Sequence, residues 1–178
     1  MDALEIDKLV RKFRKKPLFE ITALPVKLDY GAADIEKIIP HRPPLRLVDR
    51  ITGYDPEQGL MVGEKFMDPD DPVFAGHFPG TPLFPGNLSV EAVGQLGLCM
   101  YYFVSNGCTH IAPDGAPVPA RATRVASAYY LQPIEPGKTV QLLAKKLEFD
   151  GYFASMIGQV LVDGQVAVVT MGEVIILG

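Results

Sequence analysis

The sequence has few of the residues that would place it among disulfide-bonded or metal-binding proteins. It contains two cysteines, Cys99 and Cys108, and no C-x-x-C spacing. Two such thiols provide neither a disulfide framework nor a zinc site, and they are typical of a reducing, cytoplasmic environment. We expect both to be buried bystanders. No phosphate-binding loop or metal-ligand cluster is present either, so the sequence gives no reason to expect a metal or redox cofactor.

The excess of charge of one sign over the other is also small. The net charge of −4 gives no reason to expect nucleic-acid binding. Residues 1–16 are the exception, because they hold three acidic residues and six basic ones, Lys8, Arg11, Lys12, Arg14, Lys15 and Lys16. Such a segment could touch a membrane surface or an acidic partner, but we favour a solvated helix with a charged face. It lacks the apolar region and cleavage site of a signal peptide.

Long hydrophobic runs are limited to one segment, Leu88–Val104. It is too short for a secure membrane span, and a carboxylate, an amide and two glycines interrupt it. Because the segment is apolar nearly all round, it predicts a helix buried on every side. Gly94 and Gly97 each cost roughly 1 kcal/mol in a helix, which favours close approach of another backbone there.

The remaining apolar segments predict mainly sheet. Residues 46–54 and 60–67 read as strands, and so do 123–132, 139–148, 152–162 and 165–177, with Asp163-Gly164 as a two-residue hairpin turn. Residues 3–14 predict a short helix with Leu4, Leu9, Val10 and Phe13 near one face. The expected fold class is α+β, one domain in which an antiparallel sheet wraps around a long buried helix.

Three residues near this helix form a candidate active site. His77 lies in the proline- and glycine-rich loop 68–86, and histidine is the usual general base near neutral pH. Glu91 lies in the apolar helix, where burial would favour a protonated carboxyl able to act as an acid. Gly86 precedes the helix, whose free N–H groups favour an oxyanion. Either side chain alone has a common structural explanation, but the combination within 15 residues is specific.

The segment GHFPGTPLFPGNLSVEAVGQ, residues 76–95, resembles the active-site signature of hot-dog-fold 3-hydroxyacyl-[acyl-carrier-protein] dehydratases. Glu91 resembles the dehydratase-only branch, since the dehydratase/isomerase branch has Asp there. IIPHRPPLRLVDRI at 38–51 and PIEPG at 133–137 resemble two further motifs of that family. The resemblance covers residues 34–178, which implies a hot-dog dehydratase domain there and an N-terminal, partly helical extension at residues 1–33.

The resemblance implies roles for the site residues. His77 would remove the α-proton of a (3R)-hydroxyacyl thioester, Glu91 would protonate or orient the departing hydroxyl, and the Gly86 amide would polarise the thioester carbonyl. Three further residues are implied at the substrate, namely Phe78, Asn87 and Gln95. The family brings its His and acid together across a homodimer interface, which implies a dimer or a trimer of dimers. The implied partner is an acyl carrier protein, and no cofactor is needed.

Some positions depart from the family pattern. Asn87 stands where a small apolar residue or cysteine is usual, and it could cap the helix or add a polar contact to the substrate. Tyr129 and Tyr130 replace an Arg-Phe pair, and residues 105–122 form a longer connection. We interpret His41 as structural, and His110 has no partner that the sequence identifies. These departures leave acyl-chain length and carrier docking open.

Two other functions remain open at this stage. Hot-dog proteins also hydrolyse thioesters with a carboxylate that activates water, although hydrolysis does not call for both His77 and Glu91. A non-catalytic acyl-binding subunit is the third reading, which the retention of His77, Glu91 and Gly86 together disfavours.

Overall fold

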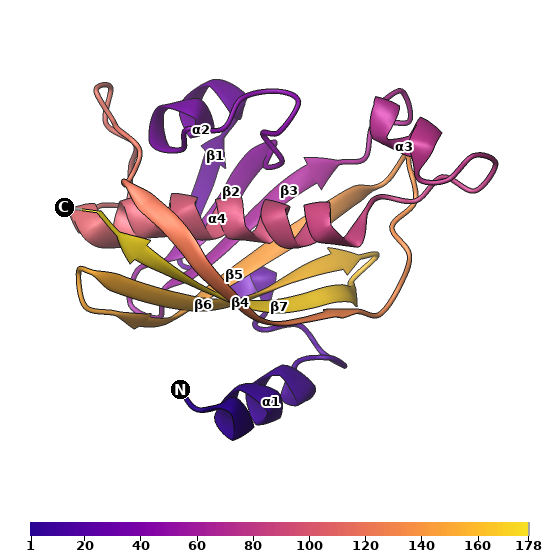
Figure 1. The fold of residues 1–178 in the computed structure, drawn as a ribbon. Coiled ribbons are helices and arrows are strands. Elements are labelled where there is room, and N and C mark those ends of the chain that lie inside the picture. Colours follow the sequence, from indigo (N-terminus) through magenta and orange to yellow (C-terminus); the bar gives the residue numbers. More distant parts are fainter. Residues whose placement is uncertain (178) are drawn as a thin grey trace.

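The structure is a computed structural model that describes residues 1–177, and its centre is one seven-stranded antiparallel sheet. The strand order is β1-β2-β3-β5-β6-β7-β4, and helix α4 lies across one face (Figure 1). The strands are β1 (Val26–Tyr30), β2 (Arg50–Asp55), β3 (Leu60–Phe66), β4 (Ala120–Tyr130), β5 (Thr139–Phe149), β6 (Phe153–Val162) and β7 (Gln165–Ile176). The helices are α1 (Ala3–Lys12), α2 (Ala32–Ile38), α3 (Pro72–Gly76) and α4 (Gly86–Asn106), with a 3-10 turn at Ile21–Ala23. The predicted α+β arrangement is confirmed.

Both faces of the central strands are buried, which explains why these strands read as nearly continuous apolar runs. Side chains alternate between the two faces of a strand. In β7, Val168 belongs to the core under α4, whereas Val169 belongs to the core under α1. Leu142 and Leu143 divide in the same way in β5. The Asp163-Gly164 hairpin is confirmed, with positive φ angles of 51° and 77° at its two residues.

The predicted strands differ from the observed ones at the N-terminal side of the sheet. β2 begins at Arg50 instead of residue 46, because the Leu47 amide donates to the Gln95 side chain instead of to a neighbouring strand. β1 was not predicted, although its side chains alternate between partly buried and exposed positions as a strand requires. It pairs with β2 at the edge of the sheet.

The composition of helix α4 predicts that it is buried on every side. In the structure one side of the helix is exposed. Its buried face packs on the sheet through residues such as Leu96, Met100 and Phe103. Its other face leaves a stripe exposed that contains Glu91 and Gly94. The sheet curves around the helix without closing over it, so this stripe has no cover within the described part of the chain.

The two glycines of α4 behave differently. A Cβ at Gly97 would overlap the Met156 sulfur, so a side chain of β6, and not a backbone, makes the close approach there. Gly94 would have nothing within 4 Å. The expected close approach of another backbone is therefore wrong at Gly97. At Gly94, the described part of the chain provides no such approach.

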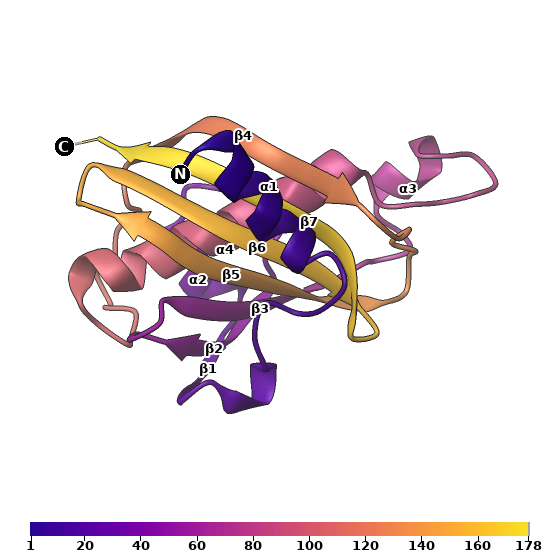
Figure 2. The same cartoon turned by 90° about the horizontal axis from the view of Figure 1, so that it is seen from below.

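Helix α1 covers the opposite face of the sheet, where it lies against β4 and β7 (Figure 2). Ile6, Val10 and Phe13 are buried against this face, whereas Leu4 is exposed, so the predicted apolar face is shifted. The basic residues Lys8, Arg11 and Lys12 point to solvent, as favoured from the sequence. Within residues 1–177, no helix combines the length and apolar character that crossing a bilayer requires.

Candidate active site

His77 is positioned by a loop that makes its own hydrogen bonds. Asp71 caps the short helix α3 by accepting from the Val73 amide, and His77 ends that helix. The Leu83 amide donates to the His77 carbonyl at 2.8 Å, and the Leu83 carbonyl lies 3.0 Å from His77 Nδ1. Because a carbonyl can only accept, the proton is assigned to Nδ1, and Nε2 is left with a free lone pair. This is the tautomer that a general base needs.

His77 opens onto a cavity of about 550 Å³ at the start of α4. Gly86 and Asn87 line the same cavity, together with Tyr130 from the end of β4. Pro85 is the N-cap residue, and no described side chain caps the helix there. The first N–H groups of a helix have no intrahelical acceptor. Gly86 therefore offers an N–H group and the positive end of the helix dipole to a ligand in this cavity.

Tyr130 forms one wall of this cavity and contacts two residues of the motif, Gly86 and Asn87. A Cβ at Gly86 would lie 2.6 Å from two carbons of the Tyr130 ring, so any other residue there would require the ring to move. The Tyr130 hydroxyl donates to Asn87 Oδ1 at 2.8 Å. Capping by Asn87 is therefore contradicted, because its side-chain oxygen is engaged by β4 and Pro85 holds the cap position. Phe78, also a sequence candidate, is exposed and stacks on the His77 ring with centroids 4.0 Å apart.

Glu91 is not buried, which corrects the expectation from the sequence. Its side chain is 48% exposed because it lies on the open stripe of α4. The Gln95 amide, which is buried, donates to Glu91 Oε1 at 2.9 Å. His41 Nε2 lies 3.4 Å from the same oxygen. Gln95 therefore contacts the acid of the candidate site, and His41, which we interpreted as structural, lies against it too.

A second, smaller cavity of about 110 Å³ adjoins Glu91. It runs between α4 and the strands β4, β6 and β7, and apart from a few polar residues its walls are apolar. Its lining includes Val90, Gly94, Leu98, Met156 and Val174. An apolar slot beside a carboxyl group suits an unbranched acyl chain better than a polar ligand.

His77 and Glu91 do not meet within one chain. Among the described residues, no hydrogen bond or ion pair joins them, and they line different cavities. One cavity holds the candidate base and the oxyanion donor, and the other holds the candidate acid. A single chain therefore keeps the candidate base and the candidate acid in separate cavities.

Comparison with known proteins gives the family of this fold and motif. Residues 39–171 match the FabA-like domain. The 3-hydroxyacyl-[acyl-carrier-protein] dehydratase FabZ of Anaeromyxobacter sp. strain Fw109-5 is 35% identical over 134 residues, covering 74% of this chain and 80% of the relative. The enzyme of the same name from Protochlamydia amoebophila is 32% identical over 139 residues, covering 76% and 84%. The chain belongs to the FabA-like family of 3-hydroxyacyl-[acyl-carrier-protein] dehydratases.

Solved structures agree with the fold of this FabA-like dehydratase. The dehydratase heterocomplex ApeI:P from Xenorhabdus doucetiae aligns with a TM-score of 0.61 at 13% identity, covering 81% of this chain and 91% of the other. A mutant thioesterase from Pseudomonas aeruginosa aligns with a TM-score of 0.52 at 14% identity, covering 72% and 80%. Identities this low show the fold alone. The hot-dog fold expected from the motif is confirmed.

Proposed function

We propose that this chain is a hydro-lyase that converts a (3R)-hydroxyacyl thioester on acyl carrier protein reversibly into the trans-2-enoyl thioester. The observation that carries the proposal is His77, held with a free Nε2 in the cavity into which the uncapped start of α4 opens. The relatives named above act on 3-hydroxyacyl-[acyl-carrier-protein] by their names, and such a reaction serves fatty-acid or related lipid or polyketide synthesis.

The proposed reaction needs three groups and no cofactor. His77 Nε2 takes the α-proton, and the electron pair of that C–H bond moves toward the thioester carbonyl. The Gly86 N–H stabilises the negative charge that develops on the carbonyl oxygen. The electrons then return to form the Cα–Cβ double bond as the Cβ–O bond breaks. Glu91 donates a proton to the departing hydroxyl, which leaves as water.

The base and the acid of this scheme would come from two copies of the chain. β4 ends the sheet and has no partner strand on its outer side within residues 1–177. Its residues 121–125 are exposed, and the cavity beside Glu91 reaches Ala122, Arg124 and Val125. The open stripe of α4 borders the same cavity. A second copy placed against β4 and this stripe would cover both and bring its His77 toward Glu91 of the first copy.

The substrate would enter as an acyl chain on the phosphopantetheine arm of a carrier protein. The cavity at His77 would receive the thioester, and the apolar cavity beside Glu91 would hold the chain. Asn87, Phe78 and Gln95 are proposed to support this site, Asn87 at the cavity of His77, Phe78 by stacking on the His77 ring, and Gln95 through Glu91. We also propose that residues 34–178 form the catalytic domain and residues 1–33 its extension.

One assay tests the proposal against the thioesterase and binding alternatives. Wild-type protein is mixed with a trans-2-enoyl thioester, and loss of the enoyl absorbance is followed beside a free-thiol assay. We expect hydration without thiol release, and a decrease of about a hundredfold or more for His77→Ala and for Glu91→Ala, because each removes a proton-transfer group.

The other outcomes are equally clear. Thiol release would indicate a thioesterase. No change in either the enoyl absorbance or the free thiol would indicate an acyl-binding protein. Near-wild-type hydration by either variant would contradict the assignment of these residues.

A further inference from the structure

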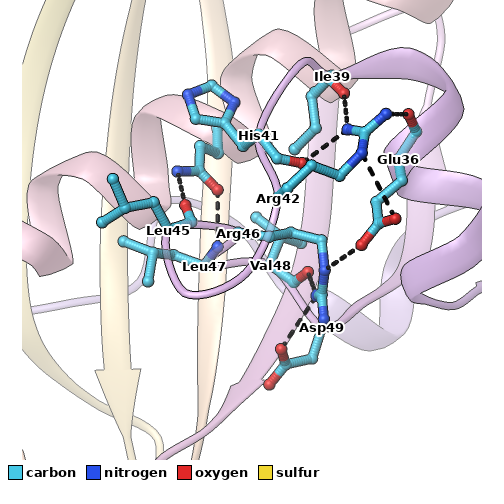
Figure 3. A network of polar contacts seen from close by, with 10 residues as sticks. Glu36, Ile39, His41, Arg42, Leu45, Arg46, Leu47, Val48 and Asp49 are labelled. Carbon is cyan, nitrogen blue, oxygen red and sulfur yellow. Dashed lines mark hydrogen bonds and ion pairs between the residues drawn. The ribbon is translucent and has the colours of Figure 1, made fainter. Parts of the chain in front are cut away.

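The loop that carries His41 is held in position by hydrogen bonds and ion pairs that do not involve Glu91. Arg42 donates to the carbonyl of Glu36 at 2.9 Å and to that of Ile39 at 3.0 Å, at the end of α2, and to the His41 carbonyl at 2.8 Å. Arg46 bridges Glu36 and Asp49. Figure 3 shows these contacts, with the His41 ring pointing away from the two arginines. The position of the imidazole is therefore set by a network that does not involve the ring itself.

Gln95 ties the same loop to α4 and has a settled orientation. Its Oε1 accepts from the Leu47 amide at 2.8 Å, and its Nε2 donates to the Leu45 carbonyl at 2.8 Å and to Glu91 Oε1. A backbone N–H can only donate, so the amide cannot be flipped without losing these bonds. Both Nε2 hydrogens are used, and one of them points at the carboxyl group.

The proton of His41 can be assigned by the same reasoning. Nδ1 is buried and has no hydrogen-bond partner, whereas Nε2 lies 3.4 Å from Glu91 Oε1. A buried ring nitrogen without a hydrogen-bond partner costs about 1–3 kcal/mol whether or not it carries the proton. The cost at Nδ1 is therefore present in both neutral tautomers, and the nearness of Glu91 Oε1, 3.4 Å from Nε2, favours the tautomer with its proton on Nε2.

One oxygen of Glu91, Oε1, thus accepts the Gln95 hydrogen bond and has the His41 Nε2 atom 3.4 Å away, whereas the other oxygen, Oε2, makes no hydrogen bond or ion pair with any residue of the described chain. We propose that His41 is a positioning residue that, with Gln95, orients the Glu91 carboxyl so that Oε2 faces the 3-hydroxyl of the substrate. The proposal rests on the proposed dehydratase function. His41 does not touch the substrate in this scheme and acts only through Glu91.

The test compares two substitutions that differ in one hydrogen-bond donor. His41→Leu removes the donor, whereas His41→Gln can place an amide N–H near the position of Nε2. We expect His41→Leu to lower kcat for enoyl hydration about tenfold with KM within about twofold, and His41→Gln to recover most of that loss. The matched control is His110→Leu, an exposed histidine far along the chain, which leaves both constants unchanged.

Two further readouts separate positioning from a structural role. In a Glu91→Gln background, His41→Leu should cause no further loss, because its effect passes through the carboxyl group. Independently of activity, ¹⁵N NMR of the His41 ring in the full-length protein should show the neutral tautomer with its proton on Nε2.

The inference is overturned if His41→Leu keeps the wild-type kcat, if His41→Gln is as impaired as His41→Leu, if the loss persists in the Glu91→Gln background, or if the proton lies on Nδ1. These results would leave a working His77 and Glu91 untouched. A wild-type protein that does not hydrate enoyl thioesters would instead contradict the proposed function, and the NMR result would then decide the orientation alone.

Discussion

The two faces of the central sheet are built from the same strands, but they differ in how completely a helix covers them. On the α1 face, apolar side chains and one buried amide close the contact completely. Gln159 is fully buried, its Nε2 donates to the carbonyls of Phe13 and Lys16 at 2.6 and 3.0 Å, and its Oε1 accepts from the Leu18 amide at 2.8 Å. On the α4 face, a larger core leaves a stripe and two cavities open. The difference suggests that the α1 face contributes to stability and the α4 face to chemistry.

The substitution that tests this comparison with the largest expected effect is at Gly86, on the α4 face. Gly86→Ala would place a methyl group 2.6 Å from the Tyr130 ring, which is half exposed and would have to move outward, away from its hydrogen bond to Asn87. We expect kcat/KM for enoyl hydration to fall about tenfold or more, because the ring and the Gly86 N–H lose their positions, while the free energy of unfolding falls by less than about 1 kcal/mol. Steady-state kinetics and urea denaturation measure the two effects.

A glycine outside the site provides the control for this substitution. Gly31 has nothing within 4 Å of its added Cβ, so Gly31→Ala should leave kcat/KM unchanged. A Gly86→Ala protein that keeps full activity would show that this end of α4 does not bind the reacting group.

The converse substitution is Gln159→Ala, on the α1 face. It should lower the free energy of unfolding by about 1–3 kcal/mol, because buried backbone groups of the segment after α1 lose their partner. We expect kcat to stay within about twofold of wild type at temperatures where the protein is folded, since Gln159 contacts neither cavity. Thermal denaturation and the enoyl assay check both parts.

Lys8→Ala is the matched control on the same face, and as an exposed substitution it should change stability by less than about 0.5 kcal/mol. A large decrease in kcat for Gln159→Ala would mean that the two faces are coupled and that the comparison fails.

The sequence predicted the features that depend on local pattern. The helix at 88–104 and the hairpin at Asp163-Gly164 follow from apolar content and turn chemistry, and both are present. β1 was missed, although Val26, Leu28 and Tyr30 alternate with polar residues, because five residues at a sheet edge give a weak signal. The strand expected from residue 46 starts later because the Arg46 amide donates to the Arg42 carbonyl and the Leu47 amide donates to Gln95 across the fold.

At the candidate site, sequence reasoning named candidate groups but did not predict their surroundings. Glu91 was expected to be buried because composition shows that a helix is apolar but not which part of it the sheet leaves uncovered. The contact of His41 with Glu91 joins residues far apart in the chain, which local patterns do not reveal. The one signal in the sequence was that Pro-His-Arg-Pro lies in the motif at 38–51 that resembles the family.

The central claim is that each active site combines His77 of one copy with Glu91 of another. Mixing His77→Ala and Glu91→Gln proteins under conditions that exchange subunits tests it directly. Random pairing makes about half of the dimers mixed, and each mixed dimer holds one intact site of two, so activity should recover to about a quarter of wild type. Mixtures that stay as inactive as either variant alone would place both groups in the same chain and contradict the account.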